Sequence, residues 1–287
     1  MTALKIIQVT DCHMLPPGEK IFGSDPGRRL RACIRDINRN HADASLCIFT
    51  GDLAHNGDPV AYEHFRRCLA ELKVPYRLLM GNHDDRAELL HAFPATPVDQ
   101  DGFLQSVCDT PAGHLILMDT ADAGLHTGAY CVSRRRWLEA RLQESGGRPV
   151  YLFLHHPPFG ISLPHLDVYG MKRADADELG ALLRRFENVT HIFAGHVHRP
   201  VSGSWHGIPF HALRGTNHQS WLDFEATDNV CSLEPPAYAV AFLGEETTVV
   251  HFHDFLDESP KYAYYPNASA GAQIQLLNHV LDEREAG

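Results

Sequence analysis

The feature that most constrains this chain is a series of five short apolar runs that each end in Asp, Asn or His side chains. Apolar runs of this length between amphipathic stretches are typical of buried strands in an α/β fold. Loops at the carboxyl ends of such strands meet at one edge of the sheet and hold ligands there. We therefore expect the five sets to form one site. The sets are Asp11-Cys12-His13, Gly51-Asp52, Gly81-Asn82-His83-Asp84, His155-His156-Pro157-Pro158 and Gly195-His196-Val197-His198.

Strands and helices alternate in the layout that the first two-thirds of the sequence predicts. Asp25 and Ser133 are expected to cap their helices, and Asp84 is a candidate cap for another. The expected strands are Leu4–Thr10, Leu46–Thr50, Tyr76–Met80, Phe103–Val107, Leu115–Asp119, Val150–Leu154 and Thr190–Ala194. The expected helices are Pro26–His41, Pro59–Leu72, Asp84–Phe93, Arg134–Gln143 and Ala174–Phe186.

Beyond residue 200 the sequence predicts mostly sheet. This layout favours two stacked sheets flanked by helices over a single doubly wound sheet. We expect residues 1–255 to form one domain and residues 256–287 a tail that serves as an oligomerisation or cap segment. The expected elements here are the strands Val201–Trp205, Ile208–Leu213, Tyr238–Leu243 and Thr247–His253 and an amphipathic helix Ala272–Glu283.

Composition excludes several classes of protein. The net charge of -11 argues against binding to nucleic-acid polymers or anionic membranes, which requires a basic surface. No apolar run approaches the roughly 18 residues of a membrane span, and no signal-peptide cleavage region follows the first strand, so we expect a cytoplasmic protein. The 7 cysteines have no C-x-x-C spacing, which disfavours a disulfide framework or a thiolate zinc site, and Cys12 is expected to be a small buried residue.

The chain has 20 histidines, which makes metal binding the first function to consider. Carboxylates together with imidazoles suit Fe, Mn, Zn or Co. Asp52 has two carboxylate oxygens and could bridge two ions, whereas Asn82 would be a neutral oxygen donor. With two divalent ions, two aspartates and one hydroxide, the site keeps a charge of roughly +1, which attracts an anionic phosphate ester.

The ordered series resembles the calcineurin-like metallophosphoesterase superfamily over about residues 4–200. Within it, the chain is similar to the bacterial class III cyclic-nucleotide phosphodiesterases and more closely to bacterial glycerophosphodiesterases. The segments shared with the latter are Gly18-Glu19-Lys20, Gly81-Asn82-His83-Asp84-Asp85, His155-His156-Pro157-Pro158 and Gly215-Thr216-x-His218-Gln219.

The resemblance implies a four-layer α/β/β/α sandwich of two stacked mixed sheets with a β-rich C-terminal extension, and two divalent ions per chain. His155 is preferred to His156 as a ligand because the family's ligand lies two residues before the first proline. The implied ligands are Asp11, His13, Asp52 and His198 for one ion and Asp52, Asn82, His155 and His196 for the other.

The expected reaction is attack of a metal-bound hydroxide on a small phosphodiester. The leaving alkoxide needs a proton, and His83, held by the neighbouring Asp84, is the predicted general acid. We further predict that His218 holds a phosphate oxygen and that Phe22 and Tyr169 contact the substrate. Phe159 and His165 are additional candidates for the pocket wall, whereas His41, His55, His64, His91 and His114 are expected at the surface.

Glycerophosphodiesters are the expected substrates, with 3′,5′-cyclic nucleotides as the alternative. A non-catalytic scaffold stays open as a further alternative, although all seven ligand positions are filled. A metallo-β-lactamase-type site would need Asp-His after the H-x-H, where this chain has Arg199-Pro200. We also expect a homo-oligomer, because the predicted edge strands Tyr238–Leu243 and Thr247–His253 lack helical cover and need a partner or the tail.

Overall fold

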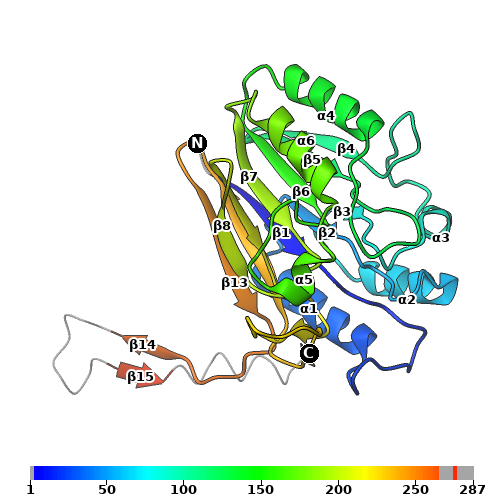
Figure 1. Ribbon diagram of the computed structural model, residues 1–287. Coiled ribbons are helices and arrows are strands. Elements are labelled where there is room, and N and C mark those ends of the chain that lie inside the picture. The colour runs from blue at the N-terminus through cyan, green and yellow to red at the C-terminus, as the bar shows by residue number, and fades with distance from the viewer. Residues whose placement is uncertain (1–2, 265–273, 277–287) are drawn as a thin grey trace. The chain divides into compact units, whose positions relative to one another are not determined.

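Two mixed β-sheets form the centre of the protein's first unit (Figure 1). The structure is a computed structural model that describes residues 3–264 and 274–276. Its internal contacts divide the chain into two units, Met1–Phe255 and Leu256–Gly287. All the strand ends that were predicted to carry the functional residues belong to the first unit.

The first sheet has five strands in the order β13-β12-β1-β2-β3. β1, β2 and β3 are parallel, and β12 and β13 are antiparallel to their neighbours. The carboxyl ends of the three parallel strands therefore lie at one edge of the sheet. Their bounds are β1 Leu4–Val9, β2 Leu46–Thr50, β3 Tyr76–Leu79, β12 Ala237–Leu243 and β13 Thr248–Asp254.

The second sheet has six strands in the order β4-β5-β6-β7-β9-β8. Its four inner strands, β5, β6, β7 and β9, are parallel, and the edge strands β4 and β8 are antiparallel to them. The bounds are β4 Ser106–Thr110, β5 Gly113–Met118, β6 Val150–Leu154, β7 Val189–Ala194, β8 Val201–Trp205 and β9 Ile208–Ala212.

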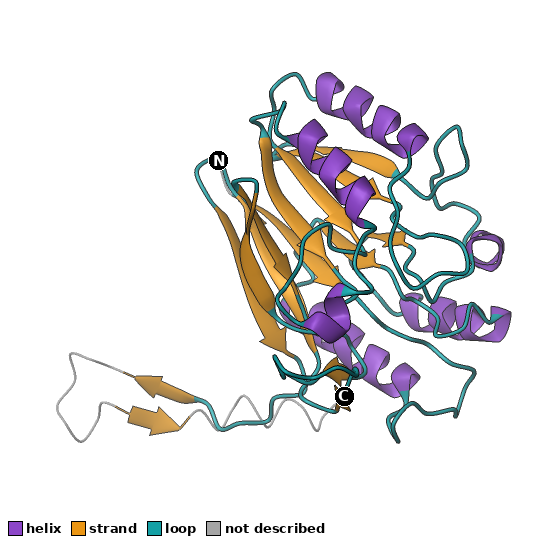
Figure 2. Ribbon diagram, in the orientation of Figure 1, coloured by secondary structure: helices purple, strands orange, loops and turns teal. Residues whose placement is uncertain are grey.

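Three apolar clusters show how the layers are stacked. Alternate residues of one strand face opposite sides, so Ile6 of β1 packs with Leu117 of β5 between the two sheets, whereas Ile7 packs beneath α1 and α2. A third cluster joins the outer face of the second sheet to α4 and α6. Figure 2 shows the resulting sequence of helix, sheet, sheet and helix, which confirms the predicted four-layer sandwich.

The helices begin near the predicted residues. Asp25 and Asp58 cap α1 and α2, and a proline occupies the first position of each helix. The expected Asp84 and Ser133 caps are wrong, because α3 is capped by Asp85 and α4 follows Cys131, which makes no side-chain cap bond. The bounds are α1 Pro26–Asn40, α2 Pro59–Leu69, α3 Arg86–Ala92, α4 Val132–Glu144, α5 Pro164–Asp167 and α6 Arg173–Leu183.

Two further expectations need correction. The strand expected at Phe103–Val107 begins three residues later, as β4, where it can pair with β5. The helix expected at Ala272–Glu283 lies mostly outside the described residues, and its described part, Ile274–Leu276, is the strand β15. β15 pairs antiparallel with β14, Tyr262–Tyr264, in the second unit.

Two other short strands, β10 (Gln219–Ser220) and β11 (Cys231–Ser232), pair in the first unit.

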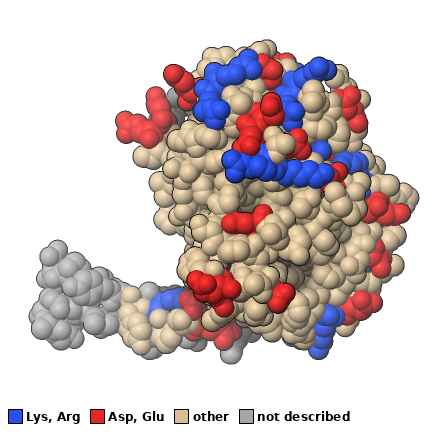
Figure 3. All heavy atoms as spheres, viewed as in Figure 1, with Lys and Arg blue, Asp and Glu red and all other residues tan. Residues whose placement is uncertain are grey.

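Figure 3 shows Lys and Arg interspersed with Asp and Glu over the upper part of the face in view. Ion pairs within single helices include Arg141–Glu144 in α4 and Arg173–Asp177 in α6. Among the described residues, no helix is long and apolar enough to cross a membrane.

Candidate metal centre

Four buried side chains from three strand ends converge at one edge of the sheets. Asp11 and His13 follow β1, Asp52 follows β2, and His198 follows β7. One ligand atom from each of them lies within 4.8 Å of all the others. His13 Nε2 is 3.0 Å from His198 Nε2 and 3.5 Å from Asp52 Oδ2, and His198 Nε2 is 3.4 Å from Asp11 Oδ1. This is the first predicted ligand set.

The second predicted set also approaches the carboxylate of Asp52. His155 Nε2 is 3.4 Å from Asp52 Oδ2 and 3.3 Å from the Asn82 side-chain oxygen. The ring of His196 is centred 5.1 Å from that of His155. Asp52 Oδ2 is thus within 3.5 Å of a nitrogen of both His13 and His155. One carboxylate oxygen is shared between the two sets, as a bridging ligand would be.

Of the two adjacent histidines after β6, His155 has the nitrogen that faces Asp52. Its Nδ1 donates to the carbonyl of Thr50 at 2.8 Å, so Nε2 is left to accept. His156 instead bonds Thr120 Oγ1 through Nδ1 at 2.9 Å. Its Nε2 is buried without a hydrogen-bond partner among the described residues, and the ring is centred 4.7 Å from that of His196.

Several predicted ligand residues at this edge have a strained backbone conformation. A left-handed φ is uncommon for residues other than glycine and costs of order 1 kcal/mol or more. Gly51 and Gly81 are required nearby, because a Cβ at either position would collide with His155. Five predicted ligands have a left-handed φ: Asp11 at 51°, His13 at 45°, Asp52 at 51°, His196 at 72° and His198 at 48°.

The electrostatics of the cluster suit a cation. Burial favours the neutral form of Asp52, but the charge and hydrogen bond of His155 and the charges of His13 and His83 together outweigh burial and hold the pKa of Asp52 well below its usual range. Burial likewise acts to lower the pKa of His155, and Asp52 raises it to about 9. Burial, with His155 beside it, lowers the pKa of His196 to about 3. The set thus offers carboxylate charge and imidazole lone pairs, the donors that a divalent ion takes up with release of protons.

His83 stands beside these sets but is held differently from our expectation. Its backbone N–H donates to Asp52 Oδ1 at 2.9 Å, and its Nδ1 donates to the carbonyl oxygen of His55 at 2.7 Å. The carboxylate of Asp84, which was expected to hold the His83 ring, accepts other hydrogen bonds. Its donors are the backbone N–H groups of Leu53, Ala54 and Gly81 and the hydroxyl of Tyr62, at 2.9–3.0 Å.

This arrangement corrects the role expected for Asp84. Burial, together with the charge of Asp52, raises the pKa of Asp84 to about 6. Its bonds tie the loop after β3 to the loop after β2, which orients Asp52 and Asn82 relative to each other. Asp84 is therefore a structural anchor of the two loops, and the backbone of His55 is the group that orients His83.

A cavity of about 350 Å³ opens onto the cluster. Phe22, Tyr169 and His218, the three predicted substrate contacts, all line it. Phe22 is centred 5.2 Å from His218, and His126 lies 6.2 Å from Tyr169 and accepts from the Asn82 amide at 3.0 Å. The cavity's described lining contains no Lys, Arg or Glu side chain. The walls of the cavity are thus aromatic and neutral, and its charge comes from the ligand cluster.

Several histidines and aromatic residues lie elsewhere than expected. His55 was predicted at the surface but lines the cavity, and His64 is buried with Nδ1 donating to the Leu15 carbonyl at 2.9 Å. Phe159 stacks on Phe210 and faces a different hollow. His55 could have been suspected because it follows Asp52 by three residues in the same loop. His126 has no such signal.

The donors fit divalent metal ions, since Asp11, His13, Asp52 and His198 bring four ligand atoms together and Asp52 Oδ2 also lies 3.4 Å from His155 Nε2, next to Asn82. Solved structures show the same fold. A dimetal phosphatase from Danio rerio superposes with a TM-score of 0.68 at 16% identity over 90% of this chain and 98% of its own. A purple acid phosphatase from yellow lupin gives 0.64 at 13% identity, covering 90% of this chain and 52% of its own.

Sequence comparisons give the family. The model of the calcineurin-like phosphoesterase family matches residues 4–200. A protein of Rhodopseudomonas palustris named as a probable cyclic nucleotide phosphodiesterase is 38% identical over 93% of this chain and 98% of its own length. A probable glycerophosphodiester phosphodiesterase of Arcobacter nitrofigilis is 30% identical over 84% of this chain and 89% of its own. The chain therefore belongs to the calcineurin-like phosphoesterase family and is a metal-dependent phosphoric diester hydrolase.

Proposed function

We propose that this protein hydrolyses small phosphodiesters at a two-metal centre. The observation that carries the proposal is the position of Asp52, whose Oδ2 lies within 3.5 Å of both His13 Nε2 and His155 Nε2. The proposed holders are Asp11, His13, Asp52 and His198 for one ion and Asp52, Asn82, His155 and His196 for the other.

When bound, divalent ions supply Lewis acidity that activates water and offsets charge on the phosphoryl group. The residues of the chain orient the other reactants. His83 Nδ1 donates to the carbonyl of His55, so Nε2 carries a proton only when the ring is in its imidazolium form, and that second proton is the one proposed to pass to the leaving group. The bond from the His83 backbone N–H to Asp52 Oδ1 keeps this imidazole beside the shared carboxylate.

His218 is the proposed contact for a phosphate oxygen. Its ring is centred 4.9 Å from that of His13 and 4.5 Å from that of His198, and it lines the cavity. Burial lowers the pKa of His218 to about 3, so the ring is neutral at physiological pH. A neutral imidazole can donate one hydrogen bond without adding charge, which suits a singly charged diester.

The proposed leaving groups follow from the cavity walls. Phe22 and Tyr169 offer aromatic surface, which can hold the cation of a choline or ethanolamine ester. This fits the glycerophosphodiester expected from the Gly18-Glu19-Lys20 and Gly215–Gln219 segments. The same surfaces can stack on a nucleobase, and among the described residues no Glu side chain lines the cavity to hold a cation. These walls therefore support 3′,5′-cyclic nucleotides as a second candidate.

One experiment separates these substrates. Values of kcat/KM should be measured for glycerophosphocholine, glycerophosphoethanolamine, cyclic AMP and a phosphomonoester on one metal-loaded preparation. The kcat/KM of a diester is expected to exceed that of the monoester, because the described lining of the cavity contains no Lys or Arg side chain for the second negative charge. A cyclic AMP value roughly tenfold above both glycerol esters assigns the second candidate, since tenfold in kcat/KM corresponds to 1.4 kcal/mol of transition-state binding. Preference for the monoester contradicts the proposal.

We also propose that residues 256–287 serve self-association. β13 is an edge strand of the first sheet, and its Val249 and Phe252 are each 42% exposed. Exposed edge strands commonly gain a partner or a cover. Light scattering should give a larger mass for the full chain than one protomer, and truncation before Pro260 should reduce it. A full-length monomer at micromolar concentration contradicts this proposal.

A further inference from the structure

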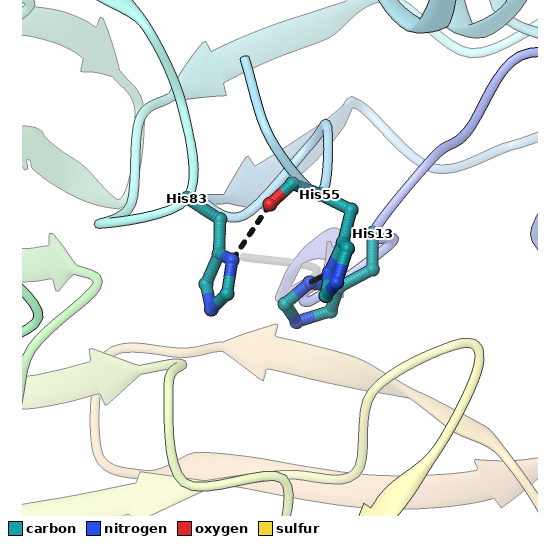
Figure 4. Close-up of side chains that lie close together, drawn as sticks. All are labelled: His13, His55 and His83. Carbon is teal, nitrogen blue, oxygen red and sulfur yellow. Dashed lines mark hydrogen bonds between the residues drawn. The ribbon is translucent and has the colours of Figure 1, made fainter. Parts of the chain in front are cut away.

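We propose that His55 is a positioning residue for the metal centre: its side chain accepts the Nδ1–H of His13 and thereby keeps His13 Nε2 directed at the ion. This inference rests on the proposed function, because it takes His13 as a ligand. Figure 4 shows the three histidines involved, with the His55 side chain next to that of His13 and the His55 carbonyl joined to His83.

The two nitrogens of His13 have opposite surroundings. Nε2 faces the centre, 3.0 Å from His198 Nε2 and 3.5 Å from Asp52 Oδ2. Nδ1 faces away and lies 3.1 Å from His55 Nδ1. A ligand nitrogen must present its lone pair, so the proton of a neutral His13 is on Nδ1. It follows that His55 Nδ1 is the acceptor and that His55 carries its own proton on Nε2.

His55 is well placed to act as a fixed acceptor. Its backbone N–H donates to the Met14 carbonyl at 3.0 Å, which ties the loop after β2 to the chain that carries His13. Its carbonyl accepts from His83 at 2.7 Å, and its ring is stacked on that of His83, with centroids 5.0 Å apart and planes 15° apart. The ring is thus held by contacts on both sides.

The chemistry of ligand histidines explains why such an acceptor matters. A histidine that binds a metal usually donates its second N–H to a carboxylate, a carbonyl or water, which fixes the ring and strengthens the ligand. In this protein a neutral imidazole takes that place. The side chain of His55 therefore acts on His13, whereas its backbone acts on His83, and a side-chain substitution can test the first effect while it preserves the second.

The test compares two substitutions of one residue. His55→Phe keeps an aromatic ring on His83 but removes the acceptor, and His55→Asn places a side-chain oxygen near the position of Nδ1 but removes the ring. His91→Phe, at an exposed histidine of α3, is the control. The full-length proteins should be equilibrated with Mn²⁺ buffered at a series of free concentrations, and their metal content measured. Thermal unfolding establishes that each variant is folded.

We expect His55→Phe to lower the affinity for one of the two Mn²⁺ ions about 10- to 100-fold. The affinities of His55→Asn should stay close to those of the parent. With Co²⁺ in place of Mn²⁺, the visible spectrum of the Phe variant should change and that of the Asn variant should not. Equal Mn²⁺ affinity in the parent and His55→Phe overturns the inference, as does equal weakening in both variants. Failure of the metal centre itself would be seen separately, as a His13→Ala protein that still holds two ions.

Discussion

Among the described residues, buried histidines contact one another in two regions, and one of these has the character of a reactive site. The rim is the set of strand-end residues Asp11, His13, Asp52, Asn82, His155, His196 and His198. The interior row consists of His191 of β7, His211 of β9 and Gln8 of β1. In the row, His191 Nε2 bonds His211 Nδ1 at 2.9 Å, and His211 Nε2 bonds the Gln8 side-chain oxygen at 2.8 Å.

The two regions differ in three respects. The rim contains two carboxylates and the row none. Five rim residues have a left-handed backbone, whereas the members of the row lie in strands and are absent from the described residues with positive φ. Finally, the Gln8 amide continues the row to the Thr50 hydroxyl and the Ala194 carbonyl, both at 3.1 Å, so its polar atoms satisfy one another. Charge, strain and converging lone pairs, rather than histidines alone, mark the metal centre.

The largest expected contrast comes from one substitution in each region. Asp52→Ala removes the carboxylate oxygen shared by both ligand sets, so hydrolysis of a chromogenic phosphodiester should fall to the rate without enzyme. His211→Gln should keep activity but lower the free energy of unfolding by about 1–3 kcal/mol, because its partners lose a buried hydrogen bond. Substantial activity in Asp52→Ala, or none in a folded His211→Gln, would contradict this contrast between the rim and the interior row.

A second prediction distinguishes ligands from the proton donor at the rim. His83→Ala should keep both metal ions and lose roughly 10²–10⁴ in rate on diesters with poor leaving groups. Activated aryl esters should lose less, because their leaving groups depart without a proton. Rates on the two kinds of ester and metal content should be measured on the same preparation. An equal loss on both esters contradicts the general-acid role.

The interior row should respond to acid. Burial lowers the pKa of His191 from 6.5 to about 4. The unfolded chain therefore binds more protons than the folded one between these values, so stability is complete above about pH 6.5 and falls as the pH drops towards 4. Urea unfolding should show that protonation of this group lowers the free energy of unfolding by up to about 3 kcal/mol. His191→Gln should flatten this part of the profile, and an unchanged profile in that variant would refute the assignment.

The smallest expected effect concerns the cavity wall. Phe22 is 60% exposed and has a left-handed φ of 51°, so its side chain contributes little packing to the fold. Phe22→Gly should raise KM about 3- to 10-fold through the lost aromatic contact, with kcat and the unfolding free energy nearly unchanged. Steady-state kinetics with the preferred diester measures this. A large loss of kcat would place Phe22 in the reaction itself.

The rim could be predicted from the sequence, and the reason is local. Each of its residues directly follows an apolar strand, and the carboxyl ends of parallel strands must meet at one edge. The same reasoning placed Phe22 at the substrate pocket, because its loop follows Asp11 and His13 closely in the sequence. Two stacked sheets could be predicted because alternating strands and helices are followed by mostly sheet, whereas the four-layer order came from the resemblance to the metallophosphoesterase superfamily.

What could not be predicted depends on contacts between distant segments. The Asp84 carboxylate accepts hydrogen bonds from backbone groups of the loop after β2. Adjacency in the sequence had suggested the ring of His83 as its partner instead. His55 is half-buried in a loop without periodicity, and its contact with His13 spans 42 positions. The shift of the α3 cap by one residue reflects the same cause, since Asp84 is engaged elsewhere and Asp85 is free to cap.

If the Asp52 carboxylate joins two metal sites, the metal content of the protein should show it. Full-length protein reconstituted with Mn²⁺ or Co²⁺ should be freed of unbound metal and analysed for metal and protein together. The parent is expected to hold about two ions per chain, and Asp52→Ala to lose both, because each site loses a ligand. A saturated parent that holds a single ion, or an Asp52→Ala protein that retains two, would contradict it.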